Sequence, residues 1–373
     1  MKIAMIGHKR VPSREGGIEV VVEALSVRMA ARGHQVTVYN RKRRRIGGKR
    51  FKRADRKKRE YQGVRIREVP VIHCKGLSAF TGSLFATLAA LFGHYDCIHY
   101  HAEGPAAMLW LPHLFGIRTV VTIHGLDWQR SKWGSFASWF LKLGEKTAAA
   151  YADRIIVLSE GARRYFKETY QRETVLIPNG VERPVVRAAK LITERWNLEK
   201  DGYLLFLARI VPEKGLNYLI QAFRKVRTKK KLVIAGSPSD TKEFYCHMQE
   251  LAKGDERILF TGFVEGEVLQ ELYSNCYLYC LPSEIEGMPI SLLEAMSYGN
   301  CCLTSDIEEC ADVVGGYGYL FRNRDVADLQ NMLQRLCDQP ELVERCRAGV
   351  SEYICSAYSW DESVEKTLAL YQK

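Results

Sequence analysis

The sequence lacks several features by which whole classes of protein are recognised. Its most apolar stretch, Leu84–Phe92, is far shorter than the roughly 20 residues of a membrane-spanning helix. Its 11 cysteines include no Cys-x-x-Cys pair, and its nine histidines show no metal-ligand spacing, which argues against a zinc site. A chain of 373 residues needs no disulfide scaffold, and free thiols fit a reducing cytosol.

Two further absences concern nucleotides. The Gly-x-Gly-x-x-Gly fingerprint of NAD sites does not occur in the chain. No Asp-x-Asp pair is present that could bridge a metal ion to a diphosphate. We therefore expect the protein to use neither NAD nor a metal cofactor.

Acidic residues are almost missing from one segment. Residues 41–59 carry 13 Lys or Arg residues and one acid, Asp55, and so account for the whole net charge of +12. The rest of the chain is neutral, which predicts a neutral globule with one basic loop. Such a loop stays solvated unless an anionic surface neutralises it. An anionic membrane and nucleic acid are the two candidate surfaces.

What is present is a regular alternation of apolar strands and helical patterns. Lys2–Gly7 and Tyr203–Ile210 are largely apolar runs of the kind found in buried parallel strands, and each begins a new series. The pattern predicts an α/β protein with two domains. Its last helices are expected at Leu329–Cys337, Glu341–Ala357 and Trp360–Lys373.

Two features of the first domain point to a ligand. Gly16 and Gly17 precede a helix predicted over Val20–Arg32, and paired glycines let backbone approach a ligand closely, although a tight turn alone would explain them. His124 follows a buried strand at the carboxyl end, where open α/β sheets bind ligands. His101 also ends a strand, and its role stays open between site and structure.

The second domain offers two cations after its first strand. Arg209 and Lys214 leave the carboxyl end of that strand five positions apart. Arginine presents a planar fork to phosphate, and lysine presents a point charge. A solvated loop with ordinary basic residues is the alternative.

The most specific pattern is the stretch from Glu286 to Glu294, which follows a short apolar strand. Pro289 suits the first helical position, so Glu286 should lie in the loop and Glu294 in the second turn. The backbone amides after Met288, beginning with that of Ile290, would then form a phosphate site at the positive end of the helix. The two carboxylates can accept hydrogen bonds from sugar hydroxyls.

Two glutamates at this spacing, followed by Ala295-Met296 and Gly299, resemble the signature of the GT4 family of retaining glycosyltransferases. The resemblance implies the GT-B architecture, with two Rossmann-like domains facing each other across a cleft. The segment Val175–Val181 resembles the hinge of that family. The expected domains are residues 1–182 and 183–357, with 358–373 forming a helix that crosses back to the first domain.

The resemblance also implies roles for the candidate residues. Those of the first domain would lie against the donor sugar, its phosphate and the acceptor: His124, Gly16 and Gly17. Those of the second domain would hold the nucleotide, the diphosphate and the sugar hydroxyls: Glu294, Arg209, Lys214, Met288, Pro289, Ile290 and Glu286.

The sequence thus predicts an enzyme that moves a sugar from a nucleotide-sugar to a lipid-linked saccharide with retention and without a metal. Gly7–Val38 resembles rhamnosyltransferase-type enzymes of bacterial capsule and cell-wall synthesis. The protein would sit on the inner face of the plasma membrane through residues 41–59. The aromatic segment Trp128–Ala150 either packs its aromatic face into the core or forms a second lipid contact, and both can hold for different residues. A nucleotide-sugar epimerase and a nucleic-acid-binding module are the rival functions.

Overall fold

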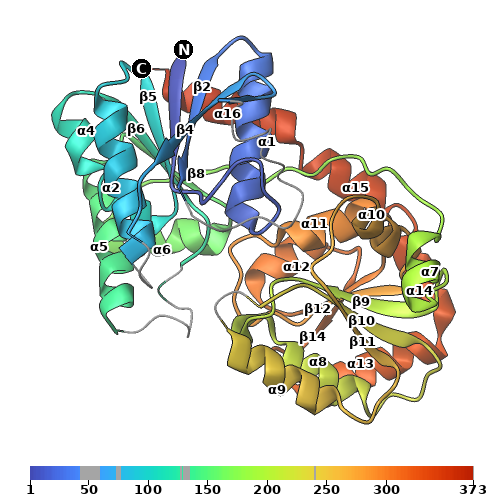
Figure 1. Cartoon of the computed structure of the whole chain (residues 1–373). Helices are drawn as coiled ribbons and strands as arrows, with labels where there is room; N and C mark the ends of the chain where they lie inside the picture. The colour runs from blue at the N-terminus through green and yellow to red at the C-terminus, as the bar shows by residue number, and fades with distance from the viewer. Residues whose placement is uncertain (43–58, 73–76, 127, 129–134, 239–240, 373) are drawn as a thin grey trace. The chain divides into compact units, whose positions relative to one another are not determined.

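The structure is a computed structural model that describes residues 1–42, 59–72, 77–126, 128, 135–238 and 241–372. The chain forms two compact units, one of Met1–Asn179 with Trp360–Lys373 and the other of Gly180–Ser359 (Figure 1). The sequence placed these divisions after residues 182 and 357. Residues 43–58 of the basic loop and 129–134 of the aromatic segment lie outside the described residues.

The first unit contains an eight-stranded sheet in the order β3-β4-β2-β1-β5-β6-β7-β8. All neighbours pair in parallel except β3 and β4. The central strands are buried almost throughout: β1 and β6 are rich in apolar residues, and β5 buries His99 and His101 as well. The strands are β1 (Lys2–Ile6), β2 (Gln35–Arg41), β3 (Glu60–Tyr61), β4 (Val64–Val69), β5 (Cys97–His101), β6 (Arg118–Ile123), β7 (Arg154–Val157) and β8 (Val175–Leu176).

Helices cover both faces of this sheet (Figure 1). One face carries α1 (Gly17–Ala31) and α16 (Trp360–Tyr371), which pack against each other. The helix α16 returns to the first unit, where Tyr371 OH lies 2.5 Å from His99 Nδ1. The other face carries α2 (Leu77–Leu91), α3 (Glu103–Ala106), α4 (Trp110–Leu114), α5 (Ser135–Tyr151) and α6 (Glu160–Tyr170).

The second unit contains a six-stranded parallel sheet in the order β11-β10-β9-β12-β13-β14. The chain starts in the middle, moves outward through β10 and β11, and then returns to the other side of β9. The strand order therefore reverses between β9 and β12, where doubly wound sheets bind ligands. The strands are β9 (Tyr203–Leu207), β10 (Lys231–Ala235), β11 (Ile258–Gly262), β12 (Leu278–Leu281), β13 (Cys302–Ser305) and β14 (Tyr319–Phe321).

The helices of the second unit also lie on both sides of its sheet. The single helix predicted over Glu341–Ala357 is wrong, because the chain is extended at Ala348 and Gly349 takes φ +80°, which separates two helices. The helices are α7 (Leu191–Trp196), α8 (Leu216–Phe223), α9 (Lys242–Ala252), α10 (Gly266–Asn275), α11 (Ile290–Ser297), α12 (Glu308–Val314), α13 (Val326–Asp338), α14 (Pro340–Arg347) and α15 (Val350–Ala357).

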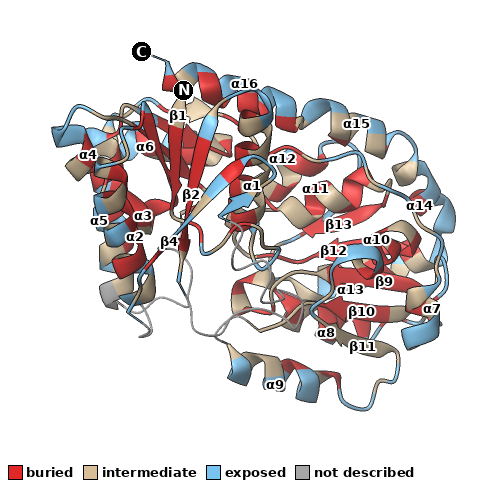
Figure 2. Cartoon of the chain, turned by 45° about the horizontal axis from the view of Figure 1, so that its top comes forward, coloured by how far each residue is buried: buried red, intermediate tan, exposed pale blue. Residues whose placement is uncertain are grey.

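Each unit has its own hydrophobic core between sheet and helices. Figure 2 shows the strands buried and the outer sides of many helices exposed. Phe206, Leu232 and Leu303 are among the fully buried residues of the second core, and Ile98, Val121 and Phe166 are among those of the first. Within the described part of the chain, no helix combines the length and apolarity needed to cross a bilayer.

Candidate functional site

The loops that follow β9 and β12 contact each other through their backbones. The backbone N–H of Glu284 donates to the carbonyl of Glu213 at 2.9 Å. Gly215 ends the first loop with φ +66°, and a Cβ atom there would lie 1.8 Å from the carbonyl oxygen of Pro282. Only glycine permits this approach. The strand-order reversal therefore carries one rigid platform rather than two separate loops.

Two residues predicted from separate motifs meet on this platform. Lys214 Nζ, at the end of a short 3₁₀ turn (Pro212–Lys214), donates to Glu286 Oε1. The side chains are 13% and 6% exposed, so this ion pair is largely withdrawn from water. An ammonium has three donors, so pairing with one carboxylate oxygen leaves it able to contact phosphate as well.

Ser283 is a site residue that the sequence motif did not single out. Its hydroxyl donates to the same oxygen, Glu286 Oε1, at 2.6 Å. The carbonyl of Ser283 accepts a hydrogen bond from Ser305 Oγ at 2.5 Å, and both serines are fully buried. The orientation of Glu286 is thus set by a lysine and a serine. The only sequence signal for Ser283 was its place directly after an apolar strand.

Arg209 is the second predicted cation and differs from Lys214. It lies two residues beyond β9 and is half-buried. Among the described residues its guanidinium has no ion-pair or hydrogen-bonding partner. Its five N–H groups are therefore available to an anion at the carboxyl edge of the sheet.

The helix α11 begins one residue later than predicted. Pro289 has an extended backbone (φ −77°, ψ 101°) and caps the helix, so Ile290 is the first helical residue. The first helical hydrogen bonds run from the amides of Leu292 and Leu293 to the carbonyl of Pro289. The amides of Ile290 and Ser291 precede those bonds at the positive end of the helix dipole. Met288, in the turn before them, is buried.

Glu294 lies in the second turn of α11, as its spacing predicted. Tyr273 OH donates to Glu294 Oε2 at 3.2 Å, and the tyrosine ring stacks on Tyr298 with centroids 5.2 Å apart. Burial first, and then the charge of Glu294, hold the pKa of Tyr273 well above its usual value. The phenol therefore stays a neutral donor that orients the carboxylate. Tyr273 is 21 residues from Glu294, and no local pattern marked it.

The carboxylates near β12 and β13 create a negative field. Burial raises the pKa of Glu309, and the nearby charges of Glu308 and Glu286 raise it further. Lys214 and Arg209 are two cations placed at the same edge of the sheet. Among the described residues, no group of three or more His, Cys, Asp or Glu side chains is arranged to hold a metal ion.

In the first unit, Gly16 and Gly17 mark the start of α1. Gly16 is the N-cap with an extended backbone, and Gly17 is the first helical residue, so the helix begins three residues earlier than predicted. The preceding loop is fixed by Glu19, whose Oε1 accepts the backbone N–H of Lys9 at 2.8 Å. The paired glycines thus form the beginning of α1, at the carboxyl edge of the sheet, and the loop before them is fixed by Glu19.

The structure brings His124 together with His101, whose role the sequence left open. His101 Nδ1 lies 3.1 Å from His124 Nε2, and His99 stacks on His101 with ring centroids 4.2 Å apart. Burial, followed by the neighbouring His99 and His124, holds the pKa of His101 well below its ordinary value. A neutral His101 can either donate to His124 Nε2 or accept from it, so the tautomers of the two rings are coupled.

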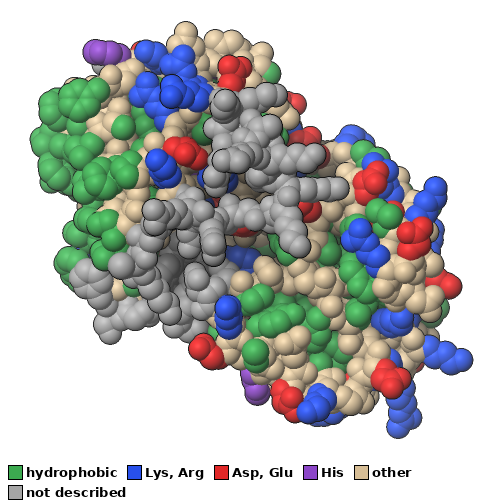
Figure 3. All heavy atoms as spheres, viewed as in Figure 1, with side chains coloured by type: hydrophobic (Ala, Val, Ile, Leu, Met, Phe, Trp, Pro, Cys, Tyr) green, Lys and Arg blue, Asp and Glu red, His purple; other side chains and the backbone are tan. Residues whose placement is uncertain are grey.

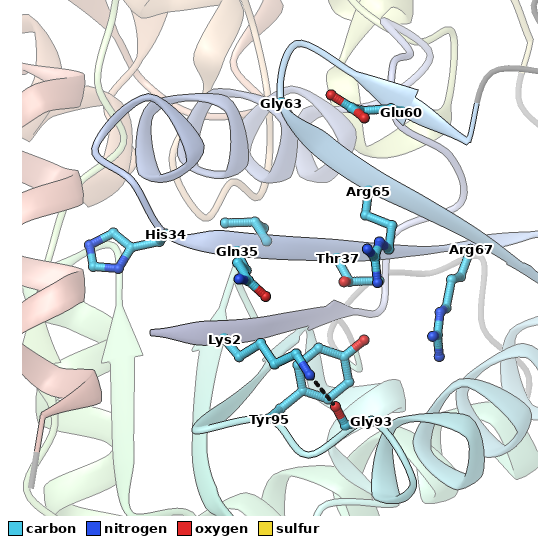
Figure 4. A pocket seen from close by; sticks show the side chains of 11 residues that line it. Lys2, His34, Gln35, Thr37, Glu60, Gly63, Arg65, Arg67, Gly93 and Tyr95 are labelled. Atoms are coloured by element: carbon cyan, nitrogen blue, oxygen red, sulfur yellow. Dashed lines mark hydrogen bonds between the residues drawn. The ribbon is translucent and has the colours of Figure 1, made fainter.

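A pocket in the first unit lies away from all these residues. It is lined by residues at the amino ends of the central strands, and Lys2 Nζ donates to the carbonyl of Gly93 there (Figure 4). Arg65 and Arg67 of β4 add positive charge. Open α/β sheets bind ligands at the opposite, carboxyl edge, so we do not assign this pocket to the candidate site.

Two family models match the chain. The one described as Glycosyltransferase Family 4 matches residues 15–183, and the one described as Glycosyl transferases group 1 matches residues 190–352. The chain is 25% identical over 402 residues to a D-inositol 3-phosphate glycosyltransferase of Acidothermus cellulolyticus, covering 96% of this chain and 85% of that protein. It is 24% identical over 303 residues to an alpha-D-kanosaminyltransferase of Streptomyces kanamyceticus, covering 74% and 77%.

Solved structures share the fold. Sucrose-phosphate synthase from Thermosynechococcus elongatus superposes with a TM-score of 0.84 at 22% identity, covering 100% of this chain and 98% of the other. HepE from Anabaena, solved in complex with UDP and glucose, superposes with a TM-score of 0.80 at 15% identity, covering 99% of this chain and 98% of the other. WaaG, a glycosyltransferase involved in lipopolysaccharide biosynthesis, gives 0.76 at 16% identity with full coverage of both chains.

The first match ends and the second begins close to the boundary between the two units, and together they span nearly the whole chain. The solved structures superpose on its full length. The rhamnosyltransferase resemblance of the N-terminal segment finds no counterpart among these proteins. Each unit therefore carries the match of one glycosyltransferase model, family 4 in the first and group 1 in the second, which identifies a GT4-type glycosyltransferase with the GT-B fold.

Proposed function

We propose that the protein transfers a sugar from a nucleoside-diphosphate sugar to a hydroxyl of a lipid-linked saccharide. One observation carries the proposal: Arg209, Lys214, the start of α11 and two glutamates lie at the strand-order reversal of the second unit. Cations and backbone amides suit a diphosphate, and carboxylates suit sugar hydroxyls. HepE, a structural relative, was solved with UDP and glucose.

In this proposal the diphosphate contacts Arg209, Lys214 and the amides of Ile290 and Ser291. Charge builds up on the diphosphate as the sugar leaves, and fixed donors stabilise that charge without reorganising. The half-buried guanidinium of Arg209, with no partner among the described side chains, is placed for this role. These groups supply the positive charge in place of a metal ion, so we propose that the reaction needs no metal and no other cofactor.

The carboxylates take the hydroxyl groups of the donor. Glu294, oriented by Tyr273, accepts hydrogen bonds from the ribose. Glu286, oriented by Ser283 and Lys214, accepts those of the transferred sugar. In the first unit, His124 contacts the donor sugar, and the helix start at Gly16 and Gly17 contacts phosphate and acceptor. These roles are the ones that the resemblance to family 4 implies, and the chemistry of each side chain and its place at the carboxyl edge of a sheet support them.

The finer features of the proposal concern stereochemistry, substrate and location. We propose that the anomeric configuration is retained and that rhamnose is one candidate donor sugar, on the resemblance of Gly7–Val38 to rhamnosyltransferase-type enzymes. The proposed acceptor is lipid-linked, as part of bacterial surface polysaccharide synthesis. The enzyme would then work at the inner face of the plasma membrane, held by residues 41–59 and by Trp128–Ala150.

A panel of nucleotide-sugars tests the donor site. A ligand that binds only the folded protein raises the midpoint of thermal unfolding. We expect at least one nucleoside-diphosphate sugar, with the rhamnose donor included in the panel, to raise it for the wild type and not for Arg209→Ala. No protection by any donor would contradict the proposal.

The productive donor then tests the chemistry. With lipid extract as acceptor, transfer should proceed in excess EDTA, and proton NMR of the product should show the anomeric configuration of the donor. Activity that disappears in EDTA and returns with magnesium or manganese would overturn the metal-free step. Donor conversion without a glycosylated product would indicate an epimerase instead.

A further inference from the structure

Exposed apolar side chains are concentrated on one helix layer of the first unit. Sixteen large hydrophobic residues are exposed in the described part of the chain, and ten lie on α2, α4 or α5 or directly after α2 or α4. Figure 3 shows hydrophobic side chains gathered over α2 and α4. We call the outer side of these three helices the apolar face. Its four most exposed members are Phe92 (82%), Leu114 (68%), Phe115 (67%) and Trp139 (58%).

The apolar face is continuous because its helices pack against one another. They precede β5, β6 and β7, which are neighbours in the sheet, so the helices lie side by side. The rings of Phe80 on α2 and Phe140 on α5 meet edge to face at 5.5 Å. The ring centroids of His113 on α4 and Tyr151 on α5 lie 5.7 Å apart. The three helices therefore present one surface.

These exposed side chains are additional to the core. The inner side of α2 buries Ala86 and Ala90, and the inner side of α5 buries Leu141 and Ala148. The aromatic segment 128–150, for which core packing and lipid contact were both predicted, is divided in the same way. Trp128 turns inward and donates to Glu145 Oε2 at 3.0 Å, whereas Trp139 faces outward.

The charges on the apolar face have one sign. α2 carries no charged residue, and α4 carries none apart from the titratable His113. On α5 the exposed charges are Lys142 and Lys146, while Glu145, the one acid of that helix, is fully buried. The three helices thus expose no carboxylate. Apolar and tryptophan side chains bordered by lysines match an anionic lipid surface, with lysines at the headgroups and tryptophans at the interface.

A second copy of the chain fits this face less well. In a two-fold dimer the same patch meets itself, so Lys142 and Lys146 would approach their own counterparts. The helices expose no carboxylate that could pair with those ammonium groups. The charge pattern therefore favours lipid as the occupant.

We infer that the apolar face of α2, α4 and α5 is a membrane-docking surface that enters the headgroup region of an anionic bilayer. This inference deepens the proposed function, because it names the surface that would bring the enzyme to a lipid-linked acceptor. The membrane docking itself does not rest on the proposed function; only its connection to that acceptor does. Docking through buried apolar side chains survives salt. Binding through a basic loop alone does not, because the screening length falls to about 3 Å at 1 M salt.

Vesicle sedimentation tests this surface with the full chain. The probes are vesicles of phosphatidylcholine alone and mixed with phosphatidylglycerol, at low salt and at about 1 M salt. The test variant is Phe92→Glu/Leu114→Glu/Phe115→Glu, and the matched control is Val185→Glu/Val186→Glu/Phe263→Glu in the second unit, at residues 57%, 69% and 48% exposed. Both variants add the same charge.

We expect the wild type and the control to bind the anionic vesicles and to keep a bound fraction at high salt. The test variant should lose that fraction and bind at least about tenfold more weakly, the equivalent of about 1.4 kcal/mol. The variant Phe92→Ser/Leu114→Ser/Phe115→Ser should lose the same bound fraction at high salt. Because serine adds no charge, this result separates the loss of apolar contact from charge repulsion. Unchanged thermal midpoints without lipid show that each variant folds.

Two outcomes would overturn the inference. Vesicle binding by the test variant equal to that of the wild type would remove the apolar face from docking. A wild-type dimer without lipid, in analytical ultracentrifugation, that becomes a monomer in the test variant would make a second copy the occupant. Protection by nucleotide-sugars is measured on the same samples, so failed docking with retained protection leaves the proposed function intact.

Discussion

Lys214 and Arg209 are both cations of the candidate site, but they contribute differently to the folded state. Lys214 is paired with Glu286 where water is largely excluded. Arg209 is half-buried and has no ion pair among the described residues. Removing one partner of a buried pair leaves an uncompensated charge, whereas removing an unpaired, partly solvated cation does not. Substituting the two residues in turn therefore distinguishes a contribution to the free energy of unfolding from a contribution to catalysis.

Lys214→Ala should lower the free energy of unfolding by about 3 kcal/mol, because Glu286 is left buried without its partner. Arg209→Ala should change it by about 0.5 kcal/mol or less. Both should lower kcat by about 100-fold through the loss of a donor to the leaving diphosphate. Urea unfolding and steady-state kinetics measure the two effects. Equal loss of stability in both variants would contradict the assignment.

Tyr273 offers a test of how Glu294 is positioned. Tyr273→Phe removes the 3.2 Å hydrogen bond to Glu294 and the 3.3 Å contact with the carbonyl of Ser291, and it keeps the stacked ring. A net hydrogen bond is worth about 1 kcal/mol, so donor affinity should fall about fivefold. The apparent KM for the donor should rise while kcat changes little. Tyr279→Phe, which removes hydrogen bonds to Ser291 Oγ and to the carbonyl of Leu207 but none to Glu294, is the comparison. An equal effect there would show that Glu294 is not the group concerned.

At the scale of elements, the site depends on how two loops are joined. The loops after β9 and β12 meet at Gly215 and Pro282, so the backbone itself brings Lys214 to Glu286. The helix start at Ile290 follows from the second loop. A change that separates the loops should therefore affect cations, carboxylate and helix amides together.

Gly215→Ala should separate the loops, because its Cβ would overlap the carbonyl oxygen of Pro282. We expect a loss of about 2 kcal/mol or more of unfolding free energy and loss of protection by the donor. Gly254→Ala is the matched control, since Gly254 also has positive φ (+84°) but open space around it. That control should lose about 1 kcal/mol from backbone strain and keep donor protection. If Gly215→Ala keeps that protection too, the junction is not what assembles the site.

At the scale of the molecule, buried histidines make stability depend on pH. Burial is the main cause that lowers the pKa of His8 from its ordinary 6.5 to about 4 and that of His99 to about 3. The unfolded chain binds protons on these residues below pH 6.5, and the folded chain does not. Acid should therefore destabilise the fold well before most carboxylates titrate.

We expect the unfolding free energy to fall as pH drops from 6.5 toward 4, with each such histidine contributing a slope of about 1.4 kcal/mol per pH unit. His99→Asn should reduce that slope by about 1.4 kcal/mol per pH unit, the contribution of one histidine. This holds whatever the substitution does to the unfolding free energy at neutral pH. Urea unfolding at a series of pH values measures it. The same slope in both proteins would mean that His99 is protonated in the folded state.

The sequence by itself determined most of the strands and their carboxyl-end residues, and its resemblance to family 4 implied the GT-B architecture. Continuous apolar runs mark buried strands locally, and a polar residue at the carboxyl end of such a run, as at His124 and Arg209, lies at the ligand-binding edge. The glutamate spacing and Pro289 likewise located α11 to within one residue. These are short-range properties of the chain, set by side-chain period and backbone restriction.

The tertiary structure alone decided which distant groups meet and which surfaces stay open. Lys214 and Glu286 are 72 residues apart, and they touch only because β9 pairs with β12. Ser283, Tyr273 and the contact of His101 with His124 depend on the same kind of long-range pairing. The sequence of α2 is apolar on all sides and would suit a buried helix, yet sheet order leaves its outer side exposed. No local pattern encodes such neighbours, because strand order and helix layering fix them through the whole domain.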